Sequence, residues 1–149
     1  MGSATPPSLS KHIQQRTREW FRKAEHELAF LDYAPFNLDD PPTDTAGKMA
    51  HMAGEYSLKA FLMLNKRKIT KTHDLVELLN ECITIYNDAD FETLRDDCQT
   101  LTRYRVDFAY PGPEPEPISV EEARAAIQTA HRIYDLIGRK AAVLGYTTP

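Results

Sequence analysis

The chain has 149 residues, of which 42% are hydrophobic and 27% are charged, a composition typical of one folded domain. Its net charge of −4 argues against a general nucleic-acid-binding protein, whose affinity comes from many phosphate contacts, but allows a local basic patch. No stretch approaches the roughly 20 apolar residues of a membrane-spanning helix, so no membrane association is expected. Because the N-terminal sequence MGSATPPSLS lacks an apolar signal core, we expect a cytoplasmic protein.

Proline and capping residues divide the chain into a tail over residues 1–9 and one helical domain over residues 10–146. The first helix is predicted over residues 10–34, where apolar residues recur with helical spacing. The second is predicted over residues 46–65, after a cap at Thr43, Asp44 or Thr45. Small residues recur along this second helix, which predicts that other helices approach it closely and that it lies centrally in a bundle.

A third helix is predicted to begin near Thr72 or His73 and to end near Tyr86, because apolar residues form a clean helical face between them. A fourth apolar stripe, from residue 91 to residue 108, is followed by a proline-rich spacer that cannot be helical. Ser119 and Glu122 form a capping box that starts the last helix. The sequence therefore predicts an all-α, up-and-down helical bundle of about five helices.

Few patterns in the chain are typical of catalysis or metal binding. His51 and Glu55 are four residues apart on the second predicted helix, a spacing that more often gives a hydrogen-bonded couple than a pair of metal ligands. Glycine-rich phosphate loops and cysteine-based zinc motifs are absent, so neither a metal nor a cofactor is expected. Cys82 and Cys98 fall among apolar residues, which favours small buried side chains over a disulfide. Whether the protein catalyses a reaction stays open.

The stretch KRKITKTHDL, residues 66–75, places four cations and a histidine between the second and third predicted helices. In one interpretation it is a phosphate-binding rim formed by Arg67, Lys68 and Lys71 near His73, at a helix start that favours anions. In the other it is only a turn. Its cations then complement the end of one helix, and Thr72 or His73 caps the next. The second interpretation needs nothing beyond the helices themselves.

Three motifs resemble the HEPN family, named for "higher eukaryotes and prokaryotes nucleotide-binding" domains. HMAGEYSLKAFL at residues 51–62 is similar to the family's second-helix signature, with matches at Ala53, Glu55, Leu58, Lys59 and Ala60. THDLVELL at residues 72–79 resembles the opening of its third helix, and RYRVDFAYP at residues 103–111 resembles a segment that ends in Arg-Tyr-Pro. The resemblance covers roughly residues 16–144.

The resemblance implies a helical bundle that forms a homodimer and works beside a minimal nucleotidyltransferase, as in toxin–antitoxin pairs. Some members are metal-independent ribonucleases with an arginine and a histidine a few residues apart. Arg124 and His131 have six residues between them on the last predicted helix, within about 20° of the same direction. Arg67 and His73 also satisfy the spacing but lie in the turn.

At residue 109 the chain has alanine where the family pattern has arginine, so a phosphate-binding role there is either lost or passes to Arg103 or Arg105. Three functions stay open. We prefer a non-catalytic module that binds a nucleotide or RNA through Arg67, Lys68, Lys71, His73, Arg103 and Arg105. The alternatives are a ribonuclease toxin that uses Arg124 and His131, and a dimeric adaptor without a small ligand. Lys59 is expected to be structural, with its ammonium reaching a carboxylate or solvent.

Overall fold

The computed structural model describes residues 9–108, 110–112 and 116–147, and within them it has six helices and no strand. They are α1 (Lys11–Leu31), α2 (Thr43–Leu64), α3 (Leu75–Ile85), α4 (Ala89–Glu92), α5 (Arg95–Asp107) and α6 (Val120–Val143). The predicted all-α bundle is confirmed, and the fourth predicted helix is divided into α4 and α5. Residues 1–8 of the predicted tail lie outside the described residues, as do Ala109 and part of the proline-rich spacer.

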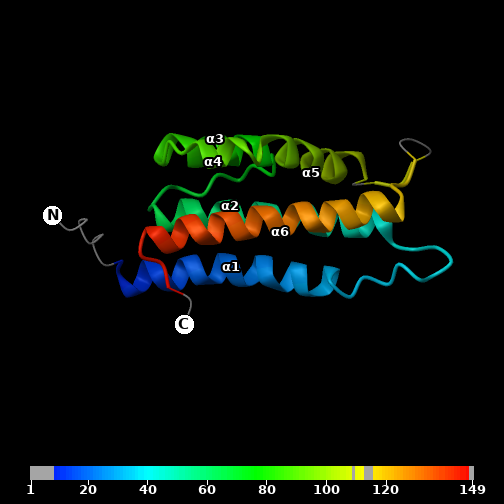
Figure 1. Cartoon of the computed structure of the whole chain (residues 1–149), viewed down its shortest axis with the longest axis horizontal. Coiled ribbons are helices and arrows are strands. Elements are labelled where there is room, and N and C mark those ends of the chain that lie inside the picture. The colour runs from blue at the N-terminus through cyan, green and yellow to red at the C-terminus, as the bar shows by residue number, and fades with distance from the viewer. Residues whose placement is uncertain (1–8, 109, 113–115, 148–149) are drawn as a thin grey trace.

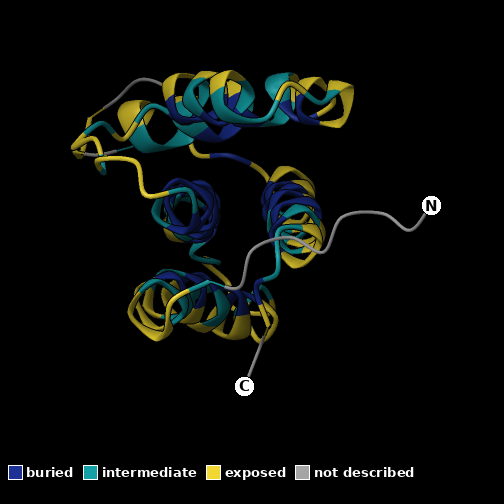
Figure 2. Cartoon of the chain, turned by 90° about the vertical axis from the view of Figure 1, so that its left-hand side faces the viewer, coloured by how far each residue is buried: buried dark blue, intermediate teal, exposed yellow. Residues whose placement is uncertain are grey.

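The helices pack in three layers, with α2 and α6 between α1 on one side and α3–α5 on the other (Figure 1). α2 contacts α1, α3, α5 and α6, which is the central position that its small residues predict. Buried faces turn inward from every layer when the bundle is viewed from its end (Figure 2). Gly54 lies where the layers meet, because a Cβ added there would be 3.1 Å from Leu75 and 3.4 Å from Ile133.

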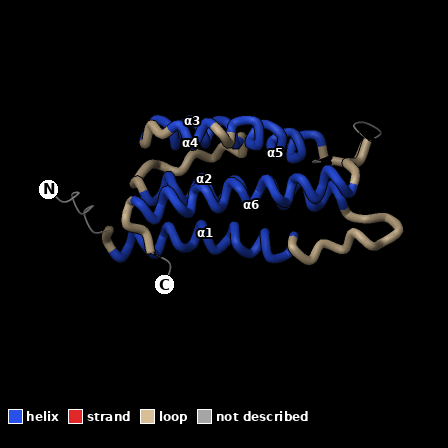
Figure 3. The backbone as a smooth tube through the Cα atoms, in the orientation of Figure 1, coloured by secondary structure: helices blue, strands red, loops and turns tan. Residues whose placement is uncertain are grey.

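Helix α3 runs in the same direction as α2. Leu75 at its start lies beside Gly54, and the Sγ of Cys82, two turns later, is 3.8 Å from the carbonyl oxygen of Leu58. The connecting residues 65–74 must therefore return along the bundle before α3 can begin, and they appear as a long loop rather than a tight turn (Figure 3). We call residues 65–74 the basic connection.

Some of the predicted helix starts are confirmed, and others are wrong. Ser119 and Glu122 form the expected capping box of α6, and Ser10 caps α1. The predicted caps of α2 are wrong, because α2 already begins at Thr43 after Pro42 and has no side-chain cap. Asp44 instead accepts a hydrogen bond from the amide of Ile118, 3.2 Å away, and so ties the start of α2 to the chain entering α6.

Candidate functional site

Three polar residues on α2 are buried in the middle of the bundle. His51, Glu55 and Lys59 follow one another at steps of four, so they share one face of the helix. Their exposed fractions are 0%, 2% and 5%. Since buried charged groups need partners, this face is expected to bind other polar groups.

Those partners are one another and His73 of the basic connection. The ammonium of Lys59 lies 3.0 Å from one oxygen of Glu55, and the Nδ1 of His73 lies 2.9 Å from the other. The Nε2 of His51 is 2.7 Å from the backbone carbonyl oxygen of His73. Because the carboxylate and the carbonyl only accept, both histidines donate here. Glu55 thus holds the side chain of His73 while His51 holds its backbone. We call His51, Glu55, Lys59 and His73 the polar cluster.

The local surroundings determine the charge state of His51. Burial lowers the pKa of His51, and the nearby charges of Arg105 and His73 act in the same direction. The hydrogen bond to the carbonyl of His73 and the charge of Glu55 oppose that change. With Nε2 donating, Nδ1 is the bare nitrogen, and it is buried without a hydrogen-bond partner among the described residues. His51 is therefore a neutral anchor rather than a ligand-facing group.

His73 and Lys59 face different surroundings. The His73 side chain is 47% exposed, so its ring reaches the surface while Glu55 fixes its orientation. The ammonium of Lys59 is 5.9 Å from the centre of the Trp20 ring, which adds a cation–π contact to its bond with Glu55. Lys59 therefore reaches a carboxylate as its structural role predicts.

The basic connection leaves α2 through a left-handed residue. Lys66 has φ +59°, its amide bonds to the carbonyl of Met63, and the amide of Arg67 bonds to the carbonyl of Leu62. These two bonds form a Schellman motif, whose left-handed position is usually glycine. A lysine there costs about 1 kcal/mol of backbone strain. The predicted cap of α3 at Thr72 or His73 is wrong, since the carboxylate of Asp74 caps that helix.

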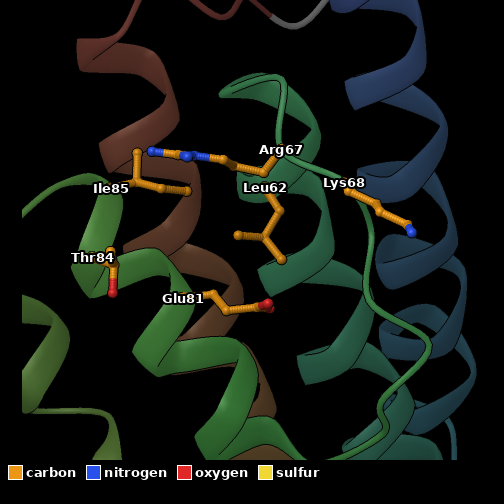
Figure 4. A pocket seen from close by; sticks show the side chains of 6 residues that line it. All are labelled: Leu62, Arg67, Lys68, Glu81, Thr84 and Ile85. Carbon is orange, nitrogen blue, oxygen red and sulfur yellow. The ribbon is translucent and has the colours of Figure 1, made fainter.

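A small hollow lies between the start of the basic connection and the last turns of α3. Its volume is about 220 Å³, and it is lined by Leu62, Arg67, Lys68, Glu81, Thr84 and Ile85. Arg67 extends across the hollow towards Ile85, whereas Lys68 points away from the other lining side chains (Figure 4). We call this cavity the Arg67 hollow.

The predicted phosphate-binding residues do not form one rim. Arg67 and Lys68 lie beside the end of α3, whereas His73 lies just before its start, and the length of α3 separates the two places by about 15 Å. Lys71 is exposed between them. Arg103 borders a separate groove with Asp74 and Asp96, so carboxylates flank it.

Arg124 and His131 share one side of α6, as their spacing predicts, and both contact the region where α1 leads into α2. The Nε2 of His131 is 2.9 Å from the carboxylate of Asp32. The guanidinium of Arg124 is 5.1 Å from the centre of the Phe36 ring. In a single chain these contacts fasten the loop after α1 to α6.

The pairing of His73 with Glu55 is a feature that the sequence interpretation missed. The sequence places His51 and Glu55 four residues apart, yet in the fold both bond to His73 rather than to each other. The available signal was the sequence of three polar residues at four-residue steps on a helix predicted to be central. No group of three or more potential metal ligands clusters within the part of the chain described here.

Three layers of helices with α2 at their centre, and a buried polar face on that helix, define a small all-α bundle with one basic connection. The family model of the HEPN domain matches residues 17–140, and the chain belongs to the HEPN family. Searches of the curated proteins and of the solved structures gave no match. Among the described residues, no helix has the length and apolar character needed to cross a membrane.

Proposed function

We propose that this HEPN protein is a non-catalytic module that binds a nucleotide or RNA through its basic connection. The observation that carries the proposal is a group of exposed cations, Lys66, Arg67, Lys68 and Lys71. Within the described residues none of the four forms an ion pair, whereas Arg18, Arg132 and Lys140 elsewhere are bonded to carboxylates. Unpaired cations gathered on a net acidic chain form a local site for phosphate groups.

The conformation of Lys66 supports this proposal. Glycine would adopt φ +59° without strain, yet the chain has a lysine there. The strain is local, and it sets the direction in which Arg67 leaves the helix. The polar cluster anchors the other end of the connection at His73, so the cations lie on a segment held at both ends.

The family suggests the biological setting of this binding. In the proposal, the protein forms a homodimer and acts with a minimal nucleotidyltransferase in a toxin–antitoxin-like pair in the cytoplasm. The alternative of a ribonuclease toxin has weaker support, because His131 is bonded to Asp32 and Arg124 stacks against Phe36. The third alternative, an adaptor without a small ligand, leaves the unpaired cations of the connection without a role.

The test compares two neighbouring Arg–Lys pairs. Short single-stranded RNA and mononucleotides are titrated into the wild type, an Arg67→Ala/Lys68→Ala variant and an Arg22→Ala/Lys23→Ala variant, at low and physiological salt. Arg22 and Lys23 are exposed on α1, so the control removes the same two charges from another face. We expect the first variant to lose RNA affinity about tenfold and to show a shallower salt dependence, while the control binds like the wild type.

Equal losses of RNA affinity in both variants would mean that only the net charge matters, which would overturn the proposed site. RNA cleavage that disappears in Arg124→Ala or His131→Ala would replace the proposal with the ribonuclease. A dimer without nucleotide or RNA affinity at either salt concentration would favour the adaptor.

A further inference from the structure

The Arg67 hollow contains both signs of charge. Arg67 and Glu81 both line it, Leu62 and Ile85 supply apolar surface, and the Glu81 side chain points towards the basic connection while Arg67 extends towards Ile85 (Figure 4). The Thr70 hydroxyl lies 2.8 Å from each oxygen of Glu81, and since a carboxylate only accepts, Thr70 is the donor. The basic connection thus orients this carboxylate beside its own cations.

The carboxylate of Glu81 disfavours a phosphate group in the interior, and the volume limits the size of any occupant. A phosphate there would meet the carboxylate of Glu81, so the favourable place for phosphate is outside, beside Lys68, which lines the edge and points away from the other lining side chains (Figure 4). The volume of about 220 Å³ is also below the range of about 300–1,000 Å³ in which drug-sized ligands are enclosed. A flat, uncharged group of modest size fits better.

An unpaired nucleobase meets these requirements. Its faces are apolar enough to contact Leu62 and Ile85, and the planar guanidinium of Arg67 can stack on a base. Its edge can donate N–H groups to Glu81. A carboxylate offers about four acceptor positions, so the Thr70 hydroxyl leaves room for further donors.

The acceptor-only chemistry of Glu81 discriminates among bases. Guanine presents two adjacent donors, N1–H and the 2-amino group, to a carboxylate. Adenine and cytosine each place one amino donor beside a bare ring nitrogen, whose lone pair faces the carboxylate unfavourably. Uracil places its single N–H between two carbonyl acceptors.

We propose that the Arg67 hollow binds an unpaired guanine base, with Glu81 accepting from its N1–H and 2-amino groups and the attached phosphate outside, beside Lys68. The inference rests on the proposed function, since it assigns a base to the site whose cations bind the phosphate. It makes the protein a reader of guanine nucleotides, or of guanines in single-stranded RNA.

The test measures GMP, IMP and AMP, which have the same phosphate charge, by calorimetry and by methyl NMR shifts at Leu62 and Ile85. We expect GMP to bind about tenfold more tightly than AMP, with IMP between them because it lacks the 2-amino group. In Glu81→Gln the preference disappears or turns towards AMP, because an amide pairs with the donor and acceptor of adenine. The control Glu77→Gln, on an exposed position of α3 one turn earlier, keeps the preference for GMP.

The outcomes separate this inference from the proposed function. Equal affinities for the three nucleotides, all lost in Arg67→Ala/Lys68→Ala, would leave phosphate binding in place and overturn base recognition. Retention of the GMP preference in Glu81→Gln would also overturn it. If no nucleotide and no RNA binds the wild type, the proposed function fails and this inference fails with it.

Discussion

His51 is completely buried, and its ring has one nitrogen bonded to the backbone of His73 and one without a partner among the described residues. A proton on that second nitrogen would place a positive charge inside the bundle near Arg105. Burial accordingly lowers the pKa of His51 below the value of about 6.5 expected in the unfolded chain. Protonation of His51 therefore couples the stability of the fold to pH.

The sign of this coupling predicts an acid-sensitive fold. Below about pH 6.5 the unfolded chain binds a proton at His51, whereas the folded chain binds one only at a lower pH, near its lowered pKa. Stability is therefore fully present above that pH and falls towards the folded pKa, with a slope of up to about 1.4 kcal/mol per pH unit. Urea unfolding from pH 8 to pH 5 measures it.

His51→Gln tests the assignment, because glutamine keeps a donor for the carbonyl of His73 but does not titrate. Its unfolding free energy should fall less steeply between pH 6.5 and pH 5 than that of the wild type. His26→Gln, at an exposed position of α1, is the control and should follow the wild-type curve. Parallel curves for His51→Gln and the wild type would contradict the coupling.

At the scale of elements, α2 is central because small residues on one part of its surface let neighbouring helices approach closely. Gly54 allows the side chains of Leu75 on α3, Leu101 on α5 and Ile133 on α6 to converge on one point of the helix. Gly138 on α6 is the opposite case, since a Cβ added there meets no atom within 4 Å. The two glycines therefore have different physical roles in helices of similar length.

Substitutions at these glycines should change stability in opposite directions. Gly138→Ala gains helix propensity without a clash, and we expect the unfolding free energy to rise by about 0.5–1 kcal/mol. Gly54→Val forces branched atoms against the converging side chains and should lower it by about 1–3 kcal/mol or more. Urea midpoints of the two variants provide the measurement. A stable Gly54→Val protein would show that the layers separate more easily than this packing implies.

At the scale of the whole molecule, the parallel course of α2 and α3 decides where the charges lie. A tight turn would have gathered Arg67, Lys68 and His73 within one site, whereas the long return separates them along α3. The connection becomes an extended basic stretch, and under the proposed function such a stretch suits a single strand of RNA better than one isolated phosphate.

The two thiols report on global unfolding. Cys82 and Cys98 are free and fully buried, and burial raises the pKa of both, to about 12 for Cys98. Since the thiolate is the reactive form, neither should react with a thiol-specific reagent while the bundle is folded. We expect full labelling in denaturant and a rate in buffer that follows the population of the unfolded state. Rapid labelling of either cysteine in buffer would reveal a local opening of the α3–α5 layer.

Much of this fold could be predicted from the sequence, because helical periodicity and caps are local. The apolar stripes locate the long helices, and the pair Ser119 and Glu122 marks the start of α6. The division between α4 and α5 could not be predicted, since the apolar spacing of Phe91, Leu94 and Cys98 continues unbroken across it. Asp44 resembles a local cap in the sequence, whereas its actual partner, the amide of Ile118, is 74 residues away.

The candidate site was predictable only in part. The cations of the basic connection are visible in the sequence, but the direction of α3 determines which of them share a surface. The bond between His73 and Glu55 joins residues 18 positions apart, and it depends on that same direction. Glu81 has no special pattern around it, so its place beside Arg67 becomes apparent only in three dimensions.

The side-chain amide of Gln14 connects the first helix with the segment that follows the last one. It lies 3.2 Å from the carbonyl oxygen of Gly145 and 3.4 Å from the amide of Thr147, and Tyr146 between them packs on Phe21 of α1. The start of the first helix and the segment after the last one are thus neighbours, so the path of the chain is nearly a closed ring. A circular permutant that joins these ends with a short flexible linker and opens the chain between α5 and α6 would keep the same helix neighbours. In such a protein α6 would be translated first, directly ahead of the helix against which its final residues pack.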